Sequence, residues 1–148
     1  MLVPIPTRSL ELTVEDFPGA TGDDVSALML RLAPYLPPWC LYLRVIFIPE
    51  SNERVIANAE ADPEYRQARI YIRPLFLVEK SAEFKLNTLA HEVAHLVLWP
   101  LSDSVDFVVA ESTEAGSSIR RHIEATVRLA SESTTEDVAR IILRALSL

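Results

Sequence analysis

The chain has 148 residues, 49 % of them hydrophobic, and carries a formal net charge of −7 at pH 7. This length and composition suit one folded domain with its own core, and they argue against a disordered chain. The acidic balance, without a basic cluster, argues against a nucleic-acid partner.

Targeting signals and the cysteine content further limit the class of protein and its compartment. No continuous apolar run reaches the roughly 20 residues needed to span a bilayer. The N-terminus lacks a basic start followed by an apolar stretch. The single cysteine, Cys40, excludes an internal disulfide and a four-cysteine zinc site. We therefore expect a soluble, cytoplasmic protein without a membrane partner.

The first half of the chain predicts one helix followed by a small sheet. Residues 1–20 are rich in proline and are expected to be irregular. Apolar residues at helical spacing predict a helix over residues 23–36, which should end before Pro37 and Pro38. Short apolar and alternating stretches then predict three strands, at residues 40–49, 54–61 and 68–73.

The second half predicts helices only. Residues 82–99 contain neither glycine nor proline and carry a broad apolar surface, so a helix is expected there that ends at Pro100. Further helical stretches are predicted at residues 105–110, 119–130 and 134–146, with an interruption at 116–118. A helix, a sheet and then helices make one α+β domain over residues 1–148.

The predicted helix over residues 82–99 carries the sequence HEVAH, with His91, Glu92 and His95. Helical residues four apart share a face, so both imidazoles can hold one Zn²⁺ while Glu92 lies beside it. Zinc lowers the pKa of its bound water to about 7, and a neighbouring carboxylate can take the proton as the water attacks a carbonyl. The motif thus predicts a zinc peptidase. The alternative, a buried helix whose histidines only form hydrogen bonds, would bury three polar groups without a metal.

A catalytic zinc needs a third protein ligand, which HEVAH does not supply. The longer pattern that ends in a third histidine is excluded because position 101 is leucine. A ligand from a later helix remains, and the residues that could supply it are Glu111, Glu114, His122 and Glu124. His122 and Glu124 are two apart and point to nearly opposite sides of one helix. Spacing alone leaves this choice open.

The segments LNTLAHEVAHLVLWPL and RRHIEATVRLA resemble the gluzincin metallopeptidases, and most of all their minimal forms, the minigluzincin-like and phage-associated zinc peptidases. The resemblance covers about residues 40–130. It implies a zincin-like fold, with a three-stranded mixed sheet, an active-site helix and following helices. It also implies an endopeptidase with His91, His95 and Glu124 as zinc ligands and Glu92 as general base.

The same resemblance implies where a polypeptide substrate binds. Gluzincins have an edge strand whose backbone pairs with an extended substrate, and Asn58 and Ala59 lie in the matching segment. The extra histidine or tyrosine that stabilises the oxyanion in larger members has no clear equivalent, although Tyr65, Tyr71 and His122 are candidates. The alternative function is a zincin-fold protein that binds zinc without cleaving and acts as a protein-interaction module.

Overall fold

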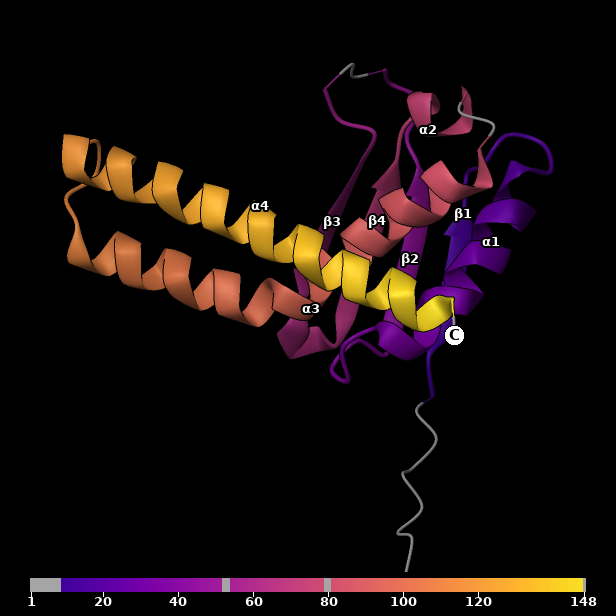
Figure 1. Cartoon of the computed structure of the whole chain (residues 1–148), viewed down its shortest axis with the longest axis horizontal. Helices are drawn as coiled ribbons and strands as arrows, with labels where there is room; N and C mark the ends of the chain where they lie inside the picture. The colour runs from indigo at the N-terminus through magenta and orange to yellow at the C-terminus, as the bar shows by residue number, and fades with distance from the viewer. Residues whose placement is uncertain (1–8, 52–53, 79–80, 148) are drawn as a thin grey trace, which may run out of the picture.

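A computed structural model describes residues 9–51, 54–78 and 81–147 of the chain. These residues form a four-stranded mixed sheet and four α-helices, with two short 3₁₀ turns (Figure 1). The predicted α+β class is confirmed. The predicted number of strands was wrong, because the sheet has four strands rather than three.

The strands lie in the order β1 (Glu11–Glu15), β2 (Tyr42–Phe47), β4 (Gln67–Ile72) and β3 (Ala57–Asp62). β1, β2 and β4 are parallel, whereas β3 pairs with β4 in the antiparallel direction. The three predicted strands correspond to β2, β3 and β4. β3 thus lies at one edge of the sheet that the described residues form.

β1 corrects the expectation that residues 1–20 are irregular; residues 1–8 of that segment lie outside the described residues. Leu12 and Val14 alternate with polar residues and pack against the core, which is the pattern of a half-buried strand. The prolines of this segment obscured the signal because they lie on either side of the strand, at Pro6 and Pro18, rather than inside it.

One face of the sheet packs against helices and the other is open. On β2 the side chains of Leu43 and Val45 are buried, while Arg44 between them is exposed and pairs with Glu15 of β1 at 2.7 Å. On β4 the same alternation buries Ala68, Ile70 and Ile72. This period of two fixes which face holds the core.

The helices are α1 (Thr21–Leu32), α2 (Pro74–Val78), α3 (Ala82–Ser112) and α4 (Ser118–Leu146). The predicted first helix is confirmed; its last residues form a 3₁₀ turn over Ala33–Tyr35. α1, α3 and the C-terminal part of α4 contribute residues to one core with the sheet, and those of the three helices include Val25, Met29, Leu89, Val93, Ala139 and Ile142.

Helices α3 and α4 form a long antiparallel hairpin (Figure 1). The turn between them contains Gly116, whose φ of 75° is a left-handed conformation that glycine adopts without strain. Ser117 then caps α4, because its hydroxyl accepts a hydrogen bond from the backbone N–H of Arg120. The interruption predicted at 116–118 is therefore the turn of the hairpin.

The prediction that Pro100 ends the helix was wrong, since α3 continues through it to Ser112. Proline inside a helix removes one backbone hydrogen bond and costs about 3 kcal/mol. Helix α3 nevertheless continues, and it packs against α4. The stretch predicted at 105–110 is accordingly part of α3, and the two stretches predicted at 119–130 and 134–146 are one helix, α4.

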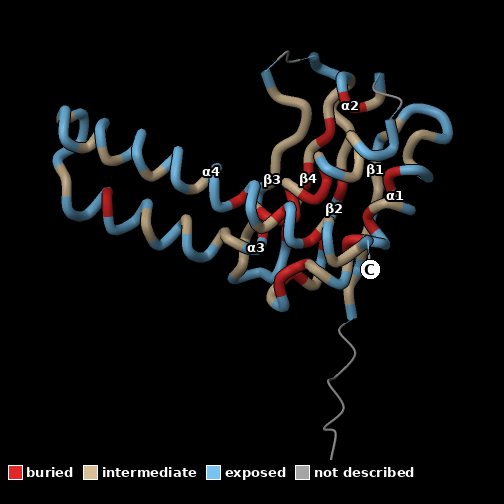
Figure 2. The backbone as a smooth tube through the Cα atoms, viewed as in Figure 1, coloured by how far each residue is buried: buried red, intermediate tan, exposed pale blue. Residues whose placement is uncertain are grey.

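The hairpin extends well beyond the sheet, and we call residues 97–131 the arm (Figures 1 and 2). Figure 2 shows the buried residues gathered on the sheet and on the neighbouring parts of the helices. Within the arm only Val109 is buried. The rest of the described chain, which we call the body, therefore contains the core.

One described helix, α3, is long and apolar enough to cross a membrane by length and composition, although no continuous apolar run predicted a span. This is weak evidence, because the core helix of a soluble protein passes the same test. The part of α3 beside the sheet is buried in the core at Leu89, Val93 and Leu96, but only 17 % of the apolar window itself is buried. The fold is compatible with a soluble protein.

Candidate metal centre

A cleft of about 750 Å³ lies where α3, β3 and α4 meet. α3 contributes His91, Glu92 and His95 to its wall, and β3 contributes the edge strand opposite them. α4 closes the third side with Glu132 and Glu136. The cleft thus combines residues from segments that are far apart in the sequence.

The two histidines lie next to each other on α3, as their spacing of four residues predicts. Their ring centroids are 4.7 Å apart and the ring planes are nearly perpendicular, at 86°. Across from them, the carboxylate of Glu132 is 3.6 Å from Nε2 of His91 and 3.8 Å from Nε2 of His95. One ligand atom from each of these three residues can be chosen so that all lie within 4.8 Å of one another.

These distances fit a shared cation better than direct hydrogen bonds. Hydrogen bonds between nitrogen and oxygen are about 2.7–3.2 Å long, and both separations exceed this range. Two ligands held about 2.0–2.1 Å from a tetrahedral zinc ion are about 3.4 Å apart. Two imidazoles and one carboxylate are also a ligand set that catalytic zinc uses. His91, His95 and Glu132 therefore could hold a divalent metal ion.

The carboxylate of Glu136 and the burial of His95 favour metal binding by the two histidines. Oε2 of Glu136 lies 3.4 Å from Nδ1 of His91, just beyond hydrogen-bond range, whereas Glu132 lies nearer Nε2. A carboxylate that approaches Nδ1 in this way favours an orientation of the imidazole in which Nε2 faces a metal. Burial, and next the neighbouring His91, lower the pKa of His95, while Glu132 opposes the shift. A lowered pKa keeps His95 neutral, which metal binding requires.

Glu92 is the buried acid of the cleft, with only 5 % of its surface exposed. Its Oε2 has no hydrogen-bond partner among the residues that the structure describes. Burial, and after it the negative charge of Glu132, raise the pKa of Glu92 to about 7. A buried, unpartnered carboxyl group with a pKa near neutrality is suited to accept and release a proton.

Glu124, the residue that the resemblance implies as third ligand, is not placed with the histidines. It lies on the arm, where its carboxylate accepts a hydrogen bond of 3.0 Å from Nε of Arg120. The reason is the length of α3. Because this helix continues through Pro100, the hairpin turn comes late, and the residue of α4 level with His95 is Glu132.

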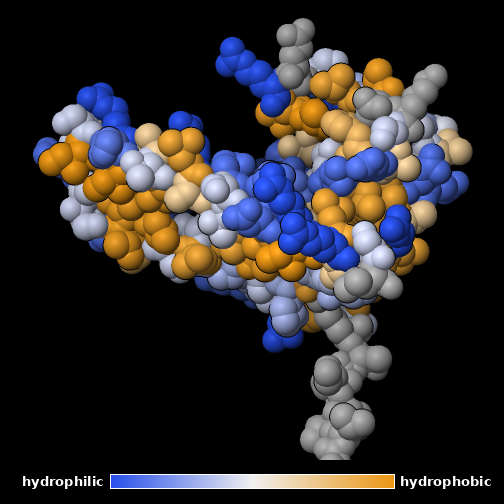
Figure 3. All heavy atoms as spheres, viewed as in Figure 1, coloured by the Kyte–Doolittle hydropathy of each residue, from blue (hydrophilic) through white to orange (hydrophobic). Residues whose placement is uncertain are grey.

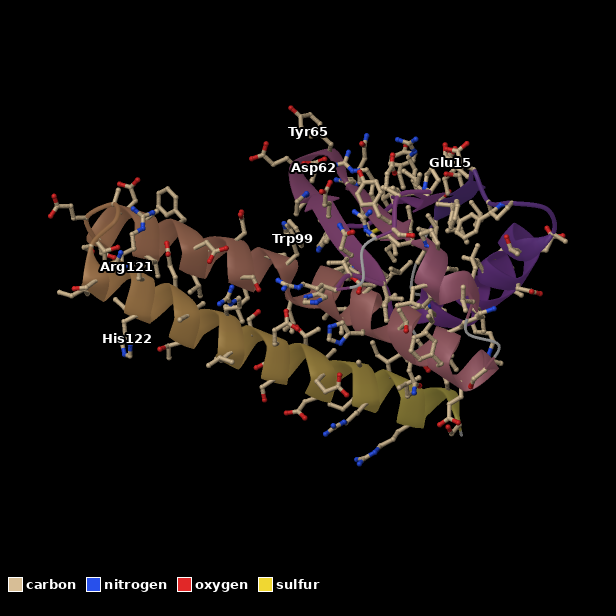
Figure 4. All side chains as sticks on the ribbon, turned by 90° about the horizontal axis from the view of Figure 1, so that it is seen from above. Glu15, Asp62, Tyr65, Trp99, Arg121 and His122 are labelled. Carbon is tan, nitrogen blue, oxygen red and sulfur yellow. The ribbon has the colours of Figure 1, made fainter. Side chains whose placement is uncertain are left out.

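The other candidates for the third ligand also lie away from the cleft. Glu111 is near the end of α3, Glu114 is in the hairpin turn and His122 is in the first turns of α4. Figure 4 shows His122 at the far end of the arm, well separated from Trp99, which lines the cleft. The geometry therefore brings together His91, Glu92 and His95 from the predicted set, but none of the four candidates.

Asn58 and Ala59 lie on β3 and form part of the cleft wall. β3 pairs with β4 on one side only within the described sheet, so its other edge faces the cleft. The oxyanion candidates lie elsewhere: Tyr65 is exposed in a turn (Figure 4), and the hydroxyl of Tyr71 is 3.4 Å from Glu60. Neither tyrosine lines the cleft.

Sequence reasoning missed Glu132 and Glu136. A signal was present, because the two acids are four residues apart and therefore share one face of α4, as His91 and His95 share one face of α3. This spacing is common on solvated helices. Only the alignment of the two helices shows that these two faces meet.

Comparison of the chain with protein-family models, with curated proteins and with solved structures finds no match. The geometry of the cleft is therefore the basis for a functional assignment.

Proposed function

We propose that the protein is a small zinc-dependent metallopeptidase of the gluzincin type, with His91, His95 and Glu132 as the zinc ligands. The observation that carries the proposal is the position of the Glu132 carboxylate, 3.6 and 3.8 Å from the two Nε2 atoms. Such separations suit ligands of one tetrahedral ion. The buried Glu92 next to the two histidines supports a catalytic rather than a purely structural site.

The roles of the side chains follow from their positions. A bound Zn²⁺ would polarise the scissile carbonyl and lower the pKa of water. Glu92 accepts a proton from the attacking water and delivers it to the leaving amine. Glu136 orients His91 through Nδ1. The buried wall around Glu92 limits access of bulk water to the carboxyl group while it holds the proton.

The substrate that we propose is an extended polypeptide. The free edge of β3 offers the backbone N–H and C=O groups of Ala59 in the cleft wall, because alternate residues face opposite edges and Asn58 faces Tyr71 of β4. An extended segment can add to such an edge as a further strand, beside Asn58 and Ala59. The zincin-like fold and a cytoplasmic location belong to the same proposal. An antiparallel edge strand beside the helix that carries HEVAH supports the former.

Metal binding tests the ligand set directly. We expect about one equivalent of zinc in protein purified without chelators, as measured by elemental analysis. Glu132→Gln should weaken zinc binding strongly, by at least about tenfold in titration calorimetry, because it removes a charged ligand. Glu124→Gln is the matched control and should bind zinc as the wild type does. If Glu124→Gln loses zinc and Glu132→Gln keeps it, Glu124 is the third ligand. Weak zinc binding by the wild type would exclude a zinc centre here.

Peptide cleavage tests the chemistry. We expect the zinc-loaded wild type to cleave unfolded protein substrates, with products identified by mass spectrometry. Glu92→Gln should retain the metal but lose at least about a hundredfold in kcat, since general base catalysis typically contributes that much. Full activity of this variant would exclude Glu92 as the base.

A second candidate function is a zinc-binding protein-interaction module that does not cleave. The exposed apolar side chains of the arm favour it, because such surfaces mark interaction sites. Zinc binding without turnover on any substrate would support this function.

A further inference from the structure

The arm exposes large hydrophobic side chains along much of its length. Five of them are at least 60 % exposed, namely Leu101, Phe107, Val108, Ile119 and Leu129. Figure 3 shows a broad hydrophobic area over this part of the hairpin. Two helices alone bury only the seam between them, and here only Val109 is buried. Exposed apolar side chains on a protruding hairpin indicate a docking surface. Of the five, Leu101 also lines the groove between the two helices.

A groove of about 930 Å³ runs between the two helices of the arm. Its floor is apolar, with Leu101, Val105 and Val109 from α3 and Val127 from α4. Further helices packed against such a seam complete a four-helix bundle. The groove therefore has the form of a surface that receives helices.

The charges of the arm are divided between its two helices. The α3 part carries Asp103, Asp106 and Glu111 and no basic residue, whereas the α4 part carries Arg120, Arg121 and Arg128 and one acid, Glu124. Arg120 pairs with Glu124 at 3.0 Å. Asp106 and Arg121 both line the groove, and neither forms an ion pair with another described residue. In the groove itself, α3 contributes one acid, Asp106, whereas α4 contributes all three arginines together with Glu124, which Arg120 pairs.

We propose that the chain forms a symmetric homodimer in which the arms of two copies pack together as a four-helix bundle. A twofold axis along the arm places α3 of one copy against α4 of the other, so that acidic and basic surfaces meet. An axis across the arm would instead place α3 against α3 and acid against acid. The division of charge selects the first arrangement.

The alignment of the hairpin identifies a pair of residues that would meet. His95 and Glu132 are level within one chain. Asp106 and Arg121 lie the same number of residues further toward the turn on their respective helices, so they are level as well. A twofold axis along the arm leaves the position of every residue along the arm unchanged. Asp106 of each copy therefore comes level with the partner's Arg121, and the dimer contains this pair twice.

Sedimentation equilibrium and light scattering of the full chain test the association. The chain has a mass of 16.6 kDa, and we expect twice this mass at micromolar concentrations. Leu101→Asp should give the monomer, because Leu101 is 62 % exposed on the groove. Ile141→Asp is the matched control, since Ile141 is 64 % exposed on α4 but outside the arm. A wild-type monomer, or equal effects of both substitutions, would overturn the proposal.

Charge reversal tests the arrangement of the helices. Asp106→Arg and Arg121→Asp should each weaken the homodimer by at least about tenfold, because each creates two repulsive pairs. An equal mixture of the two variants should form a dimer with one copy of each, because both pairs then regain opposite charges. If the single variants dimerise like the wild type, or if the mixture stays monomeric, the proposed pairing is wrong.

Two further measurements separate this proposal from other outcomes. Co-sedimentation of a monomer with anionic phospholipid vesicles would assign the arm to a membrane surface and overturn the dimer. Zinc content of the Asp106→Arg and Leu101→Asp variants should equal that of the wild type, because neither residue lines the cleft. The measurements therefore test the dimer and the metal site separately, and either proposal can be disproved while the other is supported.

Discussion

Glu92 and Glu132 are two acids of one cleft in different surroundings. Glu92 is buried and its pKa is raised to about 7, first by burial and then by the charge of Glu132. The Glu132 side chain is 56 % exposed, and its carboxylate lies beside two imidazoles. One acid is therefore suited to transfer a proton and the other is placed to serve as a ligand.

The raised pKa of Glu92 predicts a pH-dependent effect of Glu92→Gln on folding in chelator-treated protein. The folded chain holds this proton up to a pH of about 7, whereas an unfolded chain releases it near pH 4.3. Unfolding therefore becomes easier as the pH rises between these values. Glu92→Gln removes the ionisable group and with it this loss of stability at higher pH. The free energy of unfolding of the variant should therefore rise by up to about 3 kcal/mol relative to that of the wild type between pH 4 and pH 8.

Urea unfolding of both proteins at several pH values measures this difference. Glu124→Gln serves as the control for the same chemical change at an exposed position outside the cleft. A constant difference between Glu92→Gln and the wild type at all pH values would show that Glu92 is not a buried acid with a raised pKa.

At the scale of elements, the length of α3 determines the site. The helix carries His91 and His95 beside the sheet and continues past Pro100 to the turn at Gly116. The length of α3 therefore determines which residues of α4 lie beside the two histidines. A helix that ended at Pro100 would have turned back earlier and brought other residues of the chain into the cleft.

Pro100 lies inside α3 and destabilises it, so a substitution that removes the proline should stabilise the protein. Pro100→Ala supplies the missing N–H and removes the steric conflict of the ring, so we expect a gain of about 1–3 kcal/mol in the free energy of unfolding. Urea unfolding measures it. Pro74→Ala is the control, because Pro74 is the first residue of α2, where proline is tolerated. A destabilised Pro100→Ala variant would show that Pro100 is required for the path of α3.

At the scale of the whole molecule, the body and the arm are stabilised in different ways. The body has a core between the sheet and residues of all four helices, including Phe76 of α2. The arm depends on contacts between α3 and α4 and, as we propose, on a second copy of the chain. Glu132 lies where the two parts meet, since it lines both the cleft and the groove of the arm.

Patterns local in the sequence predicted much of the body. Short apolar and alternating stretches predicted β2, β3 and β4, and the spacing of His91 and His95 placed both imidazoles on one face. β1 was missed although Leu12 and Val14 alternate with polar residues, because flanking prolines outweighed a signal of only five residues.

Local sequence patterns were enough to predict the α+β class and a pair of histidines on one helical face. They were enough because helix and strand periods act between residues close along the chain. The choice of Glu132 over Glu124 as the acid beside those histidines was decided only by the tertiary structure. It depends on where two helices align, and that alignment is set by packing strong enough to carry α3 through Pro100.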